Sequence, residues 1–194
     1  MTGKNEVIAA ARTKICGTFV AVGVFGAEFS ERIVREAAPD HFYCVDPYTQ
    51  YPEFEDSLND RAVLARARKA AHDRMTPFRD RVSFIADFSV NAAKQFTDNS
   101  LDFIYVDGNH AYKFVTQDLE AWYPKLRRGG IMAGDDAHDV DGLAPRDANG
   151  DCKFVWTPTS KGLYGVRKAV QDFCRVRSIP VAWPGYQFIF QKPE

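Results

Sequence analysis

The chain has 194 residues, of which 45% are hydrophobic and 26% are charged, and its formal net charge is -1. This length is typical of one domain and is sufficient to bury a hydrophobic core, so we predict a single domain over residues 1–194. The near-zero charge provides no overall field that would attract nucleic acid or an anionic membrane, and we expect neither as a partner. We expect a small molecule as the partner, and a homo-oligomer is compatible with this composition.

The cysteines form no C-x-x-C pair, which favours reduced thiols in an intracellular protein over a zinc site or a disulfide framework. The N-terminus has no apolar signal-like segment, and nowhere are 18 consecutive residues apolar. We therefore expect a cytoplasmic protein. Arginines and lysines cluster between residues 61 and 81, and we interpret them as the solvated face of a helix rather than a track for phosphates.

Short apolar runs alternate along the chain with segments of helical spacing. The runs, which we predict to be strands, are residues 18–22, 42–45, 82–86, 103–106 and 130–133. Apolar residues recur at helical spacing within 29–37, 112–126 and 166–174, and a weaker pattern covers 56–75. This alternation predicts an α/β fold of right-handed β-α-β units, with a parallel sheet covered on both faces.

The C-terminal part departs from this pattern. After a helix that ends near residue 176, two strand-like runs at 180–183 and 186–190 are separated only by Pro184-Gly185. Strands joined so tightly must be antiparallel, because a parallel connection needs a dozen or more residues. Residues 137–160 are polar and aperiodic, and a segment of that length predicts a substrate-binding or lid loop, with a disordered excursion as the alternative.

A glycine turn follows the first predicted strand and precedes a helix. Gly23 and Gly26 would allow a ligand to approach the backbone beside the free N–H groups of the helix. The spacing is G-x-x-G rather than G-x-G-x-x-G, so it supports pyrophosphate binding poorly. Taken alone, the turn is equally well interpreted as a tight connection without a ligand.

Acidic residues end the second and third predicted strands. Asp46 lies where a carboxylate can accept both hydroxyls of a ribose, and a cap of the turn before Pro47 is the alternative. Asp87 is placed to bond an adenine amino group while Phe88 packs on the ring. The alternative is that Asp87 or Ser89 caps the next helix.

The most specific pattern is a group of carboxylates at the ends of the fourth and fifth predicted strands. Asp107 ends the fourth strand, Asp135 and Asp136 end the fifth, and neighbouring strands lie about 4.8 Å apart. Three such carboxylates repel one another unless a cation or protons neutralise them, and oxygen ligands suit Mg²⁺ or Mn²⁺. His110 is close enough along the chain to act as a general base. The alternative is that Asp107 caps a helix and that Asp135 and Asp136 are solvated.

These motifs resemble those of the class I S-adenosylmethionine-dependent methyltransferases. The resemblance is to the branch of metal-dependent sugar and macrolide O-methyltransferases and cephalosporin-hydroxylase-like proteins, and it covers residues 17–192. It rests on V-G-V-F-G-A-E-F-S, V-D-P-Y, D-F-I-Y-V-D-G-N-H, G-G-I-M-A-G-D-D and G-V-R-K-A-V. It implies a Rossmann-like three-layer sandwich with a seven-stranded, mostly parallel sheet. The strand order would be 3-2-1-4-5-7-6, with an antiparallel last strand.

The resemblance also implies roles for particular residues. The positions that match the family's cofactor-binding residues are Gly23, Val24, Phe25, Gly26, Asp46, Asp87, Phe88 and Asp107. Those that match its metal ligands, for Mg²⁺ or Mn²⁺, are Asp107, Asp135 and Asp136, and His110 matches its base. One position departs from the family: Ala21 stands where an acid usually organises the amino-acid end of the cofactor, and Glu28 is a candidate substitute.

The predicted function is therefore metal-assisted transfer of a methyl group from S-adenosylmethionine to an oxygen of a small hydroxylated molecule. Arg146 and Trp156, in the predicted loop, would select the acceptor, and His138 is a candidate further ligand. A nicotinamide-dependent oxidoreductase shares the parallel sheet and Asp46 but lacks support from the glycine spacing. A nucleoside-binding module without catalysis and, more remotely, a metal-dependent hydrolase are also compatible with the sequence.

Overall fold

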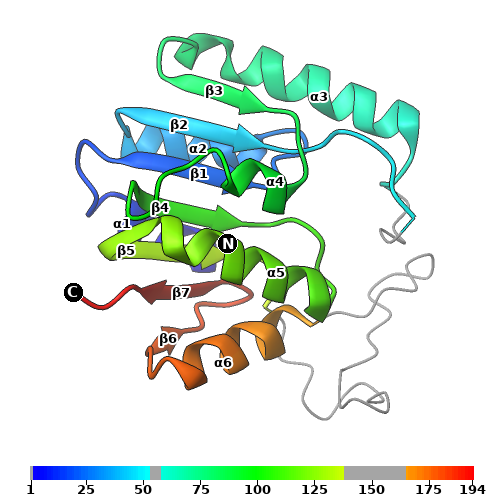
Figure 1. The fold of residues 1–194 in the computed structure, drawn as a ribbon. Coiled ribbons are helices and arrows are strands. Elements are labelled where there is room, and N and C mark those ends of the chain that lie inside the picture. The colour runs from blue at the N-terminus through cyan, green and yellow to red at the C-terminus, as the bar shows by residue number, and fades with distance from the viewer. Residues whose placement is uncertain (1, 53–57, 138–164) are drawn as a thin grey trace.

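The computed structural model describes residues 2–52, 58–137 and 165–194. Within them, seven strands form one sheet in the order β3-β2-β1-β4-β5-β7-β6 (Figure 1). The strands are β1 (Thr18–Val22), β2 (His41–Val45), β3 (Val82–Ile85), β4 (Leu101–Val106), β5 (Leu126–Gly134), β6 (Val181–Ala182) and β7 (Phe188–Gln191). Neighbouring strands are parallel from β3 to β5, whereas β7 is antiparallel to β5 and to β6. The predicted fold class and strand order are confirmed.

Helices cover both faces of the sheet, as Figure 1 shows with α5 and α6 in front and α2 behind. The helices are α1 (Thr2–Ala11), α2 (Glu28–Ala37), α3 (Arg61–Met75), α4 (Ser89–Ala93), α5 (Tyr112–Trp122) and α6 (Val166–Val176), with short 3-10 helices η1 (Thr76–Phe78) and η2 (Tyr123–Lys125). Successive residues of a strand point to opposite faces, so Phe19 packs in the core under α1, α2 and α3, whereas Val20 packs in the core under α4, α5 and α6.

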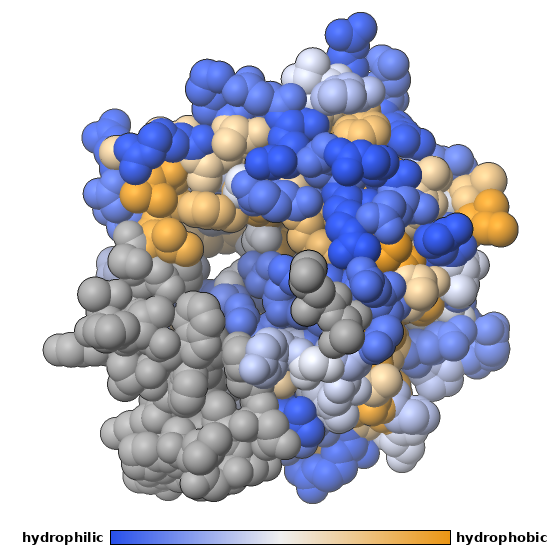
Figure 2. Space-filling view, turned by 180° about the vertical axis from the view of Figure 1, so that it is seen from behind, coloured by the Kyte–Doolittle hydropathy of each residue, from blue (hydrophilic) through white to orange (hydrophobic). Residues whose placement is uncertain are grey.

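The amphipathic pattern of α2 explains how this layer is built. Ile33 and Val34 are fully buried against the sheet, while Arg32 and Arg35 on the outer side form ion pairs. Seen from this side, the surface is mostly hydrophilic with scattered hydrophobic patches (Figure 2). In the part of the chain that the structure describes, no helix has the length and apolar character needed to cross a membrane.

Helix and strand boundaries differ from the predictions where polar residues decide them. The helix predicted over 56–75 begins at Arg61, because the Asp60 carboxylate accepts hydrogen bonds from the N–H groups of Ala62 and Val63, both at 2.9 Å. The fifth strand begins at Leu126 rather than at residue 130. The apolar pattern does not predict this start, because Arg127 interrupts it. Arg127 is exposed, and its guanidinium pairs with Asp102 on β4 at 2.8 Å.

The predicted two-residue link of the C-terminal hairpin is wrong. β6 ends at Ala182 and β7 begins at Phe188, so five residues connect them. Gly185 adopts a positive φ of 60°, and the N–H of Gln187 donates to the Pro184 carbonyl at 3.1 Å. The wider loop frees Gln187 from the strand ladder, and its side chain turns inward to buried polar partners.

Candidate functional site

The functional candidates lie in a row at one edge of the sheet. Four of them are the first residue beyond a strand, and the N–H of each still donates to the last residue of a neighbouring strand. The bonds are Gly23 N to Val45 O (2.9 Å), Asp46 N to Ile85 O (3.2 Å), Asp107 N to Val22 O (2.7 Å) and Asp135 N to Val106 O (3.2 Å). Carboxyl edges of parallel strands are where open α/β sheets bind ligands, and the ladder itself positions these residues there.

Gly23, just beyond β1, lies directly against the backbone of Asp107 and Gly108 beyond β4. Its φ is +80°, and a Cβ there would lie 2.0 Å from the carbonyl oxygen of Asp107, so no other residue fits. Gly26 does not have a positive φ. Instead, Phe25 (φ 46°) and Ala27 (φ 64°) take the left-handed conformation in this turn, which is uncommon for residues with a Cβ.

Asp46 holds this turn to the end of β2. Its two carboxylate oxygens accept hydrogen bonds from the N–H groups of Phe25 and Tyr48, both at 2.9 Å. Burial raises the pKa of Asp46, and these backbone hydrogen bonds act in the opposite direction. The turn-capping interpretation is therefore realised in the structure, and the carboxylate also lines a cavity in which a ribose could bind.

Two adjoining cavities open at this edge, and they share lining from Gly23, Pro47, Tyr51, Gly108 and Asn109. The first has a volume of about 330 Å³, and we name it the charged cavity because its lining includes Lys4, Glu28, Asp46, Asp107 and His110. The second has a volume of about 320 Å³, and we name it the apolar cavity because its lining includes Val22, Val45, Phe88, Val90 and Phe114.

The predicted cofactor residues divide between these cavities. Gly23, Val24, Phe25, Asp46 and Asp107 line the charged cavity, and Phe88 and Gly23 line the apolar cavity. Gly26 and Asp87 line neither.

The Asp87 carboxylate instead accepts a hydrogen bond from the N–H of Phe88 at 2.7 Å and one from the Asn91 side chain at 3.4 Å. The Phe88 side chain, next to it, is 42% exposed at the apolar cavity. The cofactor-binding roles of Gly26 and Asp87 stay predictions.

Three predicted residues form a compact cluster at the end of β4 and β5. The Nε2 atom of His110 lies 3.5 Å from an Asp107 oxygen and 3.3 Å from an Asp136 oxygen. One ligand atom from each residue lies within 4.8 Å of the others, a spacing that could hold a metal ion. Burial opposes protonation of His110, but the neighbouring carboxylates outweigh it and raise its pKa. Burial raises the pKa of Asp107, although the hydrogen bond and the charge of His110 act to lower it.

Asp135, the third predicted metal ligand, has other partners. One oxygen pairs with Nζ of Lys4 at 3.0 Å, and the other accepts a hydrogen bond from the Gln187 side-chain amide. The Gln187 carbonyl in turn accepts from the Tyr105 hydroxyl at 2.9 Å. Asp136 has a positive φ of 56°, which turns its side chain away from this network and towards His110. A metal-ligand role for Asp135 stays a prediction.

Sequence reasoning missed three residues of the site. Lys4 lies on α1, a helix with no predictive pattern, and Gln187 lies in the unpredicted loop before β7. Asp118 is buried (5% exposed) on α5 and lines the apolar cavity, and burial raises its pKa to about 7. The sequence carried one signal for Asp118: it is an acid on the apolar face of an amphipathic helix, three residues after Val115.

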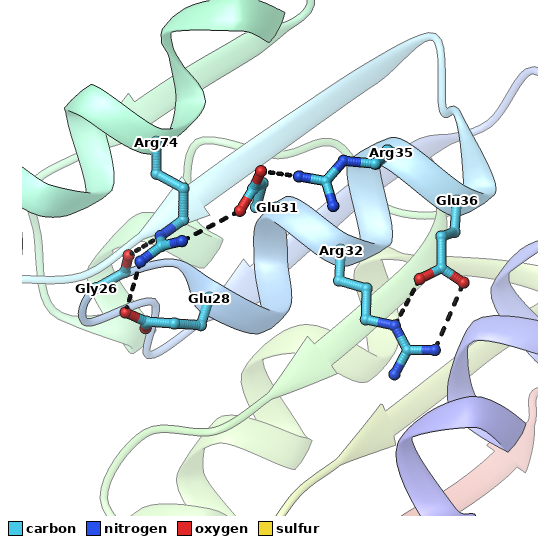
Figure 3. Close-up of polar contacts among 7 residues, drawn as sticks. All are labelled: Gly26, Glu28, Glu31, Arg32, Arg35, Glu36 and Arg74. Atoms are coloured by element: carbon cyan, nitrogen blue, oxygen red, sulfur yellow. Dashed lines mark hydrogen bonds and ion pairs between the residues drawn. The ribbon is translucent and has the colours of Figure 1, made fainter. Parts of the chain in front are cut away.

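Glu28, the candidate substitute for the acid missing at position 21, belongs to an ion-pair network (Figure 3). Arg74, from α3, donates to Glu28 at 3.0 Å, to Glu31 at 3.2 Å and to the Gly26 carbonyl at 3.0 Å. The guanidinium therefore ties α3 to the start of α2 and supports the glycine turn from outside. Glu28 still lines the charged cavity, but its carboxylate pairs with Arg74.

Some predicted features lie outside the described residues. These are most of the loop 137–160, its proposed acceptor-selecting residues Arg146 and Trp156, and the candidate ligand His138.

The family is decided by sequence comparison. A sequence model of a methyltransferase domain, methyltransferase family 24, matches residues 23–137, which is more than half of the chain. The chain belongs to this methyltransferase family. The match begins at Gly23 and includes Asp46, Phe88, Asp107 and Asp136. No curated protein matches the chain.

Solved structures show that the methyltransferase shares its fold with proteins of low sequence identity. A cofactor-bound protein of Mycobacterium tuberculosis has a TM-score of 0.66 at 12% identity, over 99% of this chain and 80% of that one. A proposed caffeoyl-CoA O-methyltransferase of Staphylococcus aureus has a TM-score of 0.65 at 12% identity, over 97% of this chain and 82% of that one. An O-methyltransferase family protein of Burkholderia thailandensis has a TM-score of 0.66 at 14% identity, over 98% of this chain and 55% of that one. S-adenosylmethionine is the cofactor expected for a class I methyltransferase.

Proposed function

We propose that this methyltransferase transfers the methyl group of S-adenosylmethionine to an oxygen of a small hydroxylated molecule, with help from a divalent cation. The observation that carries the proposal is the meeting of the two cavities at Gly23 and Gly108, beside the cluster of Asp107, His110 and Asp136. A long ligand can lie across both cavities and present its reacting centre to the cluster. The solved O-methyltransferase relatives agree with oxygen as the acceptor atom.

The two cavities suit the two ends of the cofactor. Asp46, held rigidly by the N–H groups of Phe25 and Tyr48, has lone pairs left for the ribose hydroxyls. Phe88 offers an exposed aromatic face in the apolar cavity, where an adenine ring can stack. Asp107 lines the charged cavity, where its negative charge favours the positively charged sulfonium group.

The acid–imidazole cluster fits a divalent cation in part. Asp107 and Asp136 offer hard oxygen ligands within reach of one position, as Mg²⁺ and Mn²⁺ require, whereas both oxygens of Asp135 are engaged by Lys4 and Gln187. A bound cation lowers the pKa of a coordinated hydroxyl. We assign the two oxygen positions to Asp107 and Asp136.

His110 is the proposed proton acceptor. Its Nε2 atom faces both carboxylates, and without a cation they raise its pKa, so the imidazole tends to keep its own proton. A cation held by Asp107 and Asp136 would offset their charge, and Nε2 of His110 would then be placed to take the proton of the acceptor hydroxyl. A positioned base of this kind contributes about 10²–10⁴-fold to a rate.

Calorimetric titration with S-adenosylmethionine and S-adenosylhomocysteine, with and without Mg²⁺ or Mn²⁺, tests the cofactor. Transfer of a labelled methyl group to sugar, catechol and macrolide acceptors then tests the reaction. We expect micromolar binding and cation-stimulated transfer to at least one hydroxylated acceptor. Failure to bind either compound would overturn the proposal. Binding without transfer to any acceptor would favour the alternative of a nucleoside-binding module without catalysis.

A further inference from the structure

A lysine from the first helix reaches the acids that follow β4 and β5. The Nζ atom of Lys4 lies 3.0 Å from an oxygen of Asp135. Lys4 is the only lysine or arginine among the described residues that line the charged cavity. Its helix is held in place, because the Asn5 side chain accepts a hydrogen bond from Arg32 of α2 at 2.6 Å. The function proposed above gives this cation no role.

Both carboxylate oxygens of Asp135 are engaged. One pairs with Lys4, and the other accepts a hydrogen bond from the side-chain amide of Gln187. The Gln187 carbonyl oxygen accepts in turn from the hydroxyl of the buried Tyr105 at 2.9 Å. The Asp135 side chain is only 14% exposed, so it is held between the ammonium and a buried polar chain. It cannot turn towards a bound cation without losing one of these contacts.

The position of Lys4 is unfavourable for α1 itself. Lys4 belongs to the first turn of this helix, where the helix dipole favours acids and disfavours cations, and that turn contains no acid. Burial acts to lower the pKa of Lys4, but the hydrogen bond with Asp135 and the charges of Asp107 and Asp136 outweigh it and raise the pKa. The acids beyond β4 and β5 therefore stabilise the ammonium, and the helix does not.

We infer that Lys4 is a built-in counter-ion of Asp135, which keeps this carboxylate from binding the divalent cation and thereby lowers the affinity of the site for that cation. The inference rests on the proposed function. It explains why the compact group that could hold a cation includes Asp107 and Asp136 but not their neighbour Asp135. An ammonium and a divalent cation are alternative partners for the same carboxylate, and they repel each other.

The charge of this group matches one divalent cation when Lys4 is counted. Asp107, Asp135 and Asp136 carry three negative charges when ionised, and the ammonium offsets one of them. Mg²⁺ keeps several waters in proteins and is usually bound through one or two carboxylates. Two carboxylate ligands leave coordination positions for the oxygens of a hydroxylated acceptor, whereas a third would occupy one of those positions.

Mn²⁺ alone is the probe, because calorimetry measures its binding and electron paramagnetic resonance in isotope-labelled water counts its bound waters. Lys4→Met should tighten Mn²⁺ binding by about 10- to 100-fold, the range in which partners of ligating groups change metal affinity. The number of bound waters should fall by one, because an Asp135 oxygen replaces a water. The Lys4 side chain is 42% exposed, so the variant should fold, which circular dichroism checks.

Three further variants isolate the cause. Lys4→Arg keeps the charge and the contact with a carboxylate, so its Mn²⁺ affinity should stay within about threefold of the wild type. The double variant Lys4→Met with Asp135→Asn should lose the gain and recover the bound water. Lys69→Met is the matched control, because Lys69 is an exposed lysine on α3 that pairs with Asp73. It should leave both measurements unchanged.

The inference and the proposed function fail in different ways. If the wild type and Lys4→Met bind Mn²⁺ equally well, the inference is overturned and the proposed function stands. If Lys4→Met binds more tightly but keeps the same number of bound waters, Lys4 acts only through its charge, and exclusion of Asp135 is overturned. If neither protein binds Mn²⁺ and methyl transfer needs no cation, the cation part of the proposed function fails.

Discussion

The charged cavity and the apolar cavity share Gly23 and Gly108 in their lining, and each contains an acid whose pKa is raised by burial. Burial raises the pKa of Asp107 in the first and of Asp118 in the second. Their partners differ. Asp107 faces the His110 imidazole at 3.5 Å, whereas Asp118 interacts with the hydroxyl of Ser89, which also accepts a hydrogen bond from Trp122 at 2.9 Å.

The comparison shows how one physical cause leads to two chemical roles. A carboxylate beside an imidazole and a second carboxylate can exchange a proton or attract a cation. A carboxyl group beside a neutral hydroxyl and apolar side chains stays protonated up to about pH 7 and serves packing or recognition. Substitutions that change one cavity at a time therefore have distinct expected effects on the other.

The largest effect is expected from Asp107→Ala. Because it removes a proposed oxygen ligand and the partner of His110, methyl transfer should fall by at least about 10²-fold. Binding of S-adenosylhomocysteine should remain within about fivefold, since Asp46 and the apolar cavity are unchanged. The measurement is a single-turnover methyl-transfer assay beside calorimetry, with circular dichroism to confirm folding. Unchanged turnover would rule out a role for Asp107 in metal binding or catalysis.

The next largest effect is expected on stability, from Asp118→Asn. The folded-state pKa of Asp118, about 7, lies above its ordinary value of 3.8, so the unfolded chain releases this proton first as the pH rises. The free energy of unfolding should therefore fall between about pH 4 and pH 7 and level off above, by roughly 2–4 kcal/mol. The substituted asparagine cannot ionise, and urea unfolding of the variant should lack this decrease. Asp80→Asn, at an exposed position, is the control, and an equal flattening in both variants would contradict the assignment.

Asp136→Asn and Asp135→Asn separate two neighbours in the sequence. Asp136 faces His110, and its variant should weaken cation stimulation of methyl transfer by about 10- to 100-fold, as loss of a metal-site group commonly does. Asp135 faces Lys4 and Gln187, so its variant should change the cation requirement less than about threefold. Titration of activity with Mn²⁺ measures both. Equal effects would mean that both carboxylates bind the cation, as the sequence predicted.

The smallest effect is expected from Phe88→Ala in the apolar cavity. Loss of an aromatic stacking partner should weaken binding by about 2- to 10-fold. The loss should be the same for S-adenosylhomocysteine and for 5′-methylthioadenosine, which has the adenosine but no amino-acid end. If Phe88→Ala affected the two compounds unequally, adenine would not lie against Phe88.

Much of this site follows from local sequence. Five apolar runs predict the parallel strands, and each candidate acid follows the end of a run, so the edge of the sheet that carries Asp46, Asp107 and Asp135 could be located without a structure. Gly23 was expected to let a ligand approach the backbone, and the structure adds a different reason for glycine there, because a Cβ would collide with the Asp107 carbonyl. The positive φ values of Phe25 and Ala27 could not be found, because neither residue type indicates that conformation.

What the sequence by itself determined is therefore the sheet, its order through the family resemblance, and the residues that reach its carboxyl edge. Only the tertiary structure decided how those residues pair. Asp135 and Asp136 are the same residue type at adjacent positions, so the sequence does not distinguish their roles. In the structure, the positive φ of Asp136 directs its carboxylate to His110, whereas the Asp135 carboxylate contacts Lys4 and Gln187. Periodicity predicts which face of an element is buried. It carries no information about partners that lie far apart in the chain, and it is such partners that set the charge and the pKa of each acid.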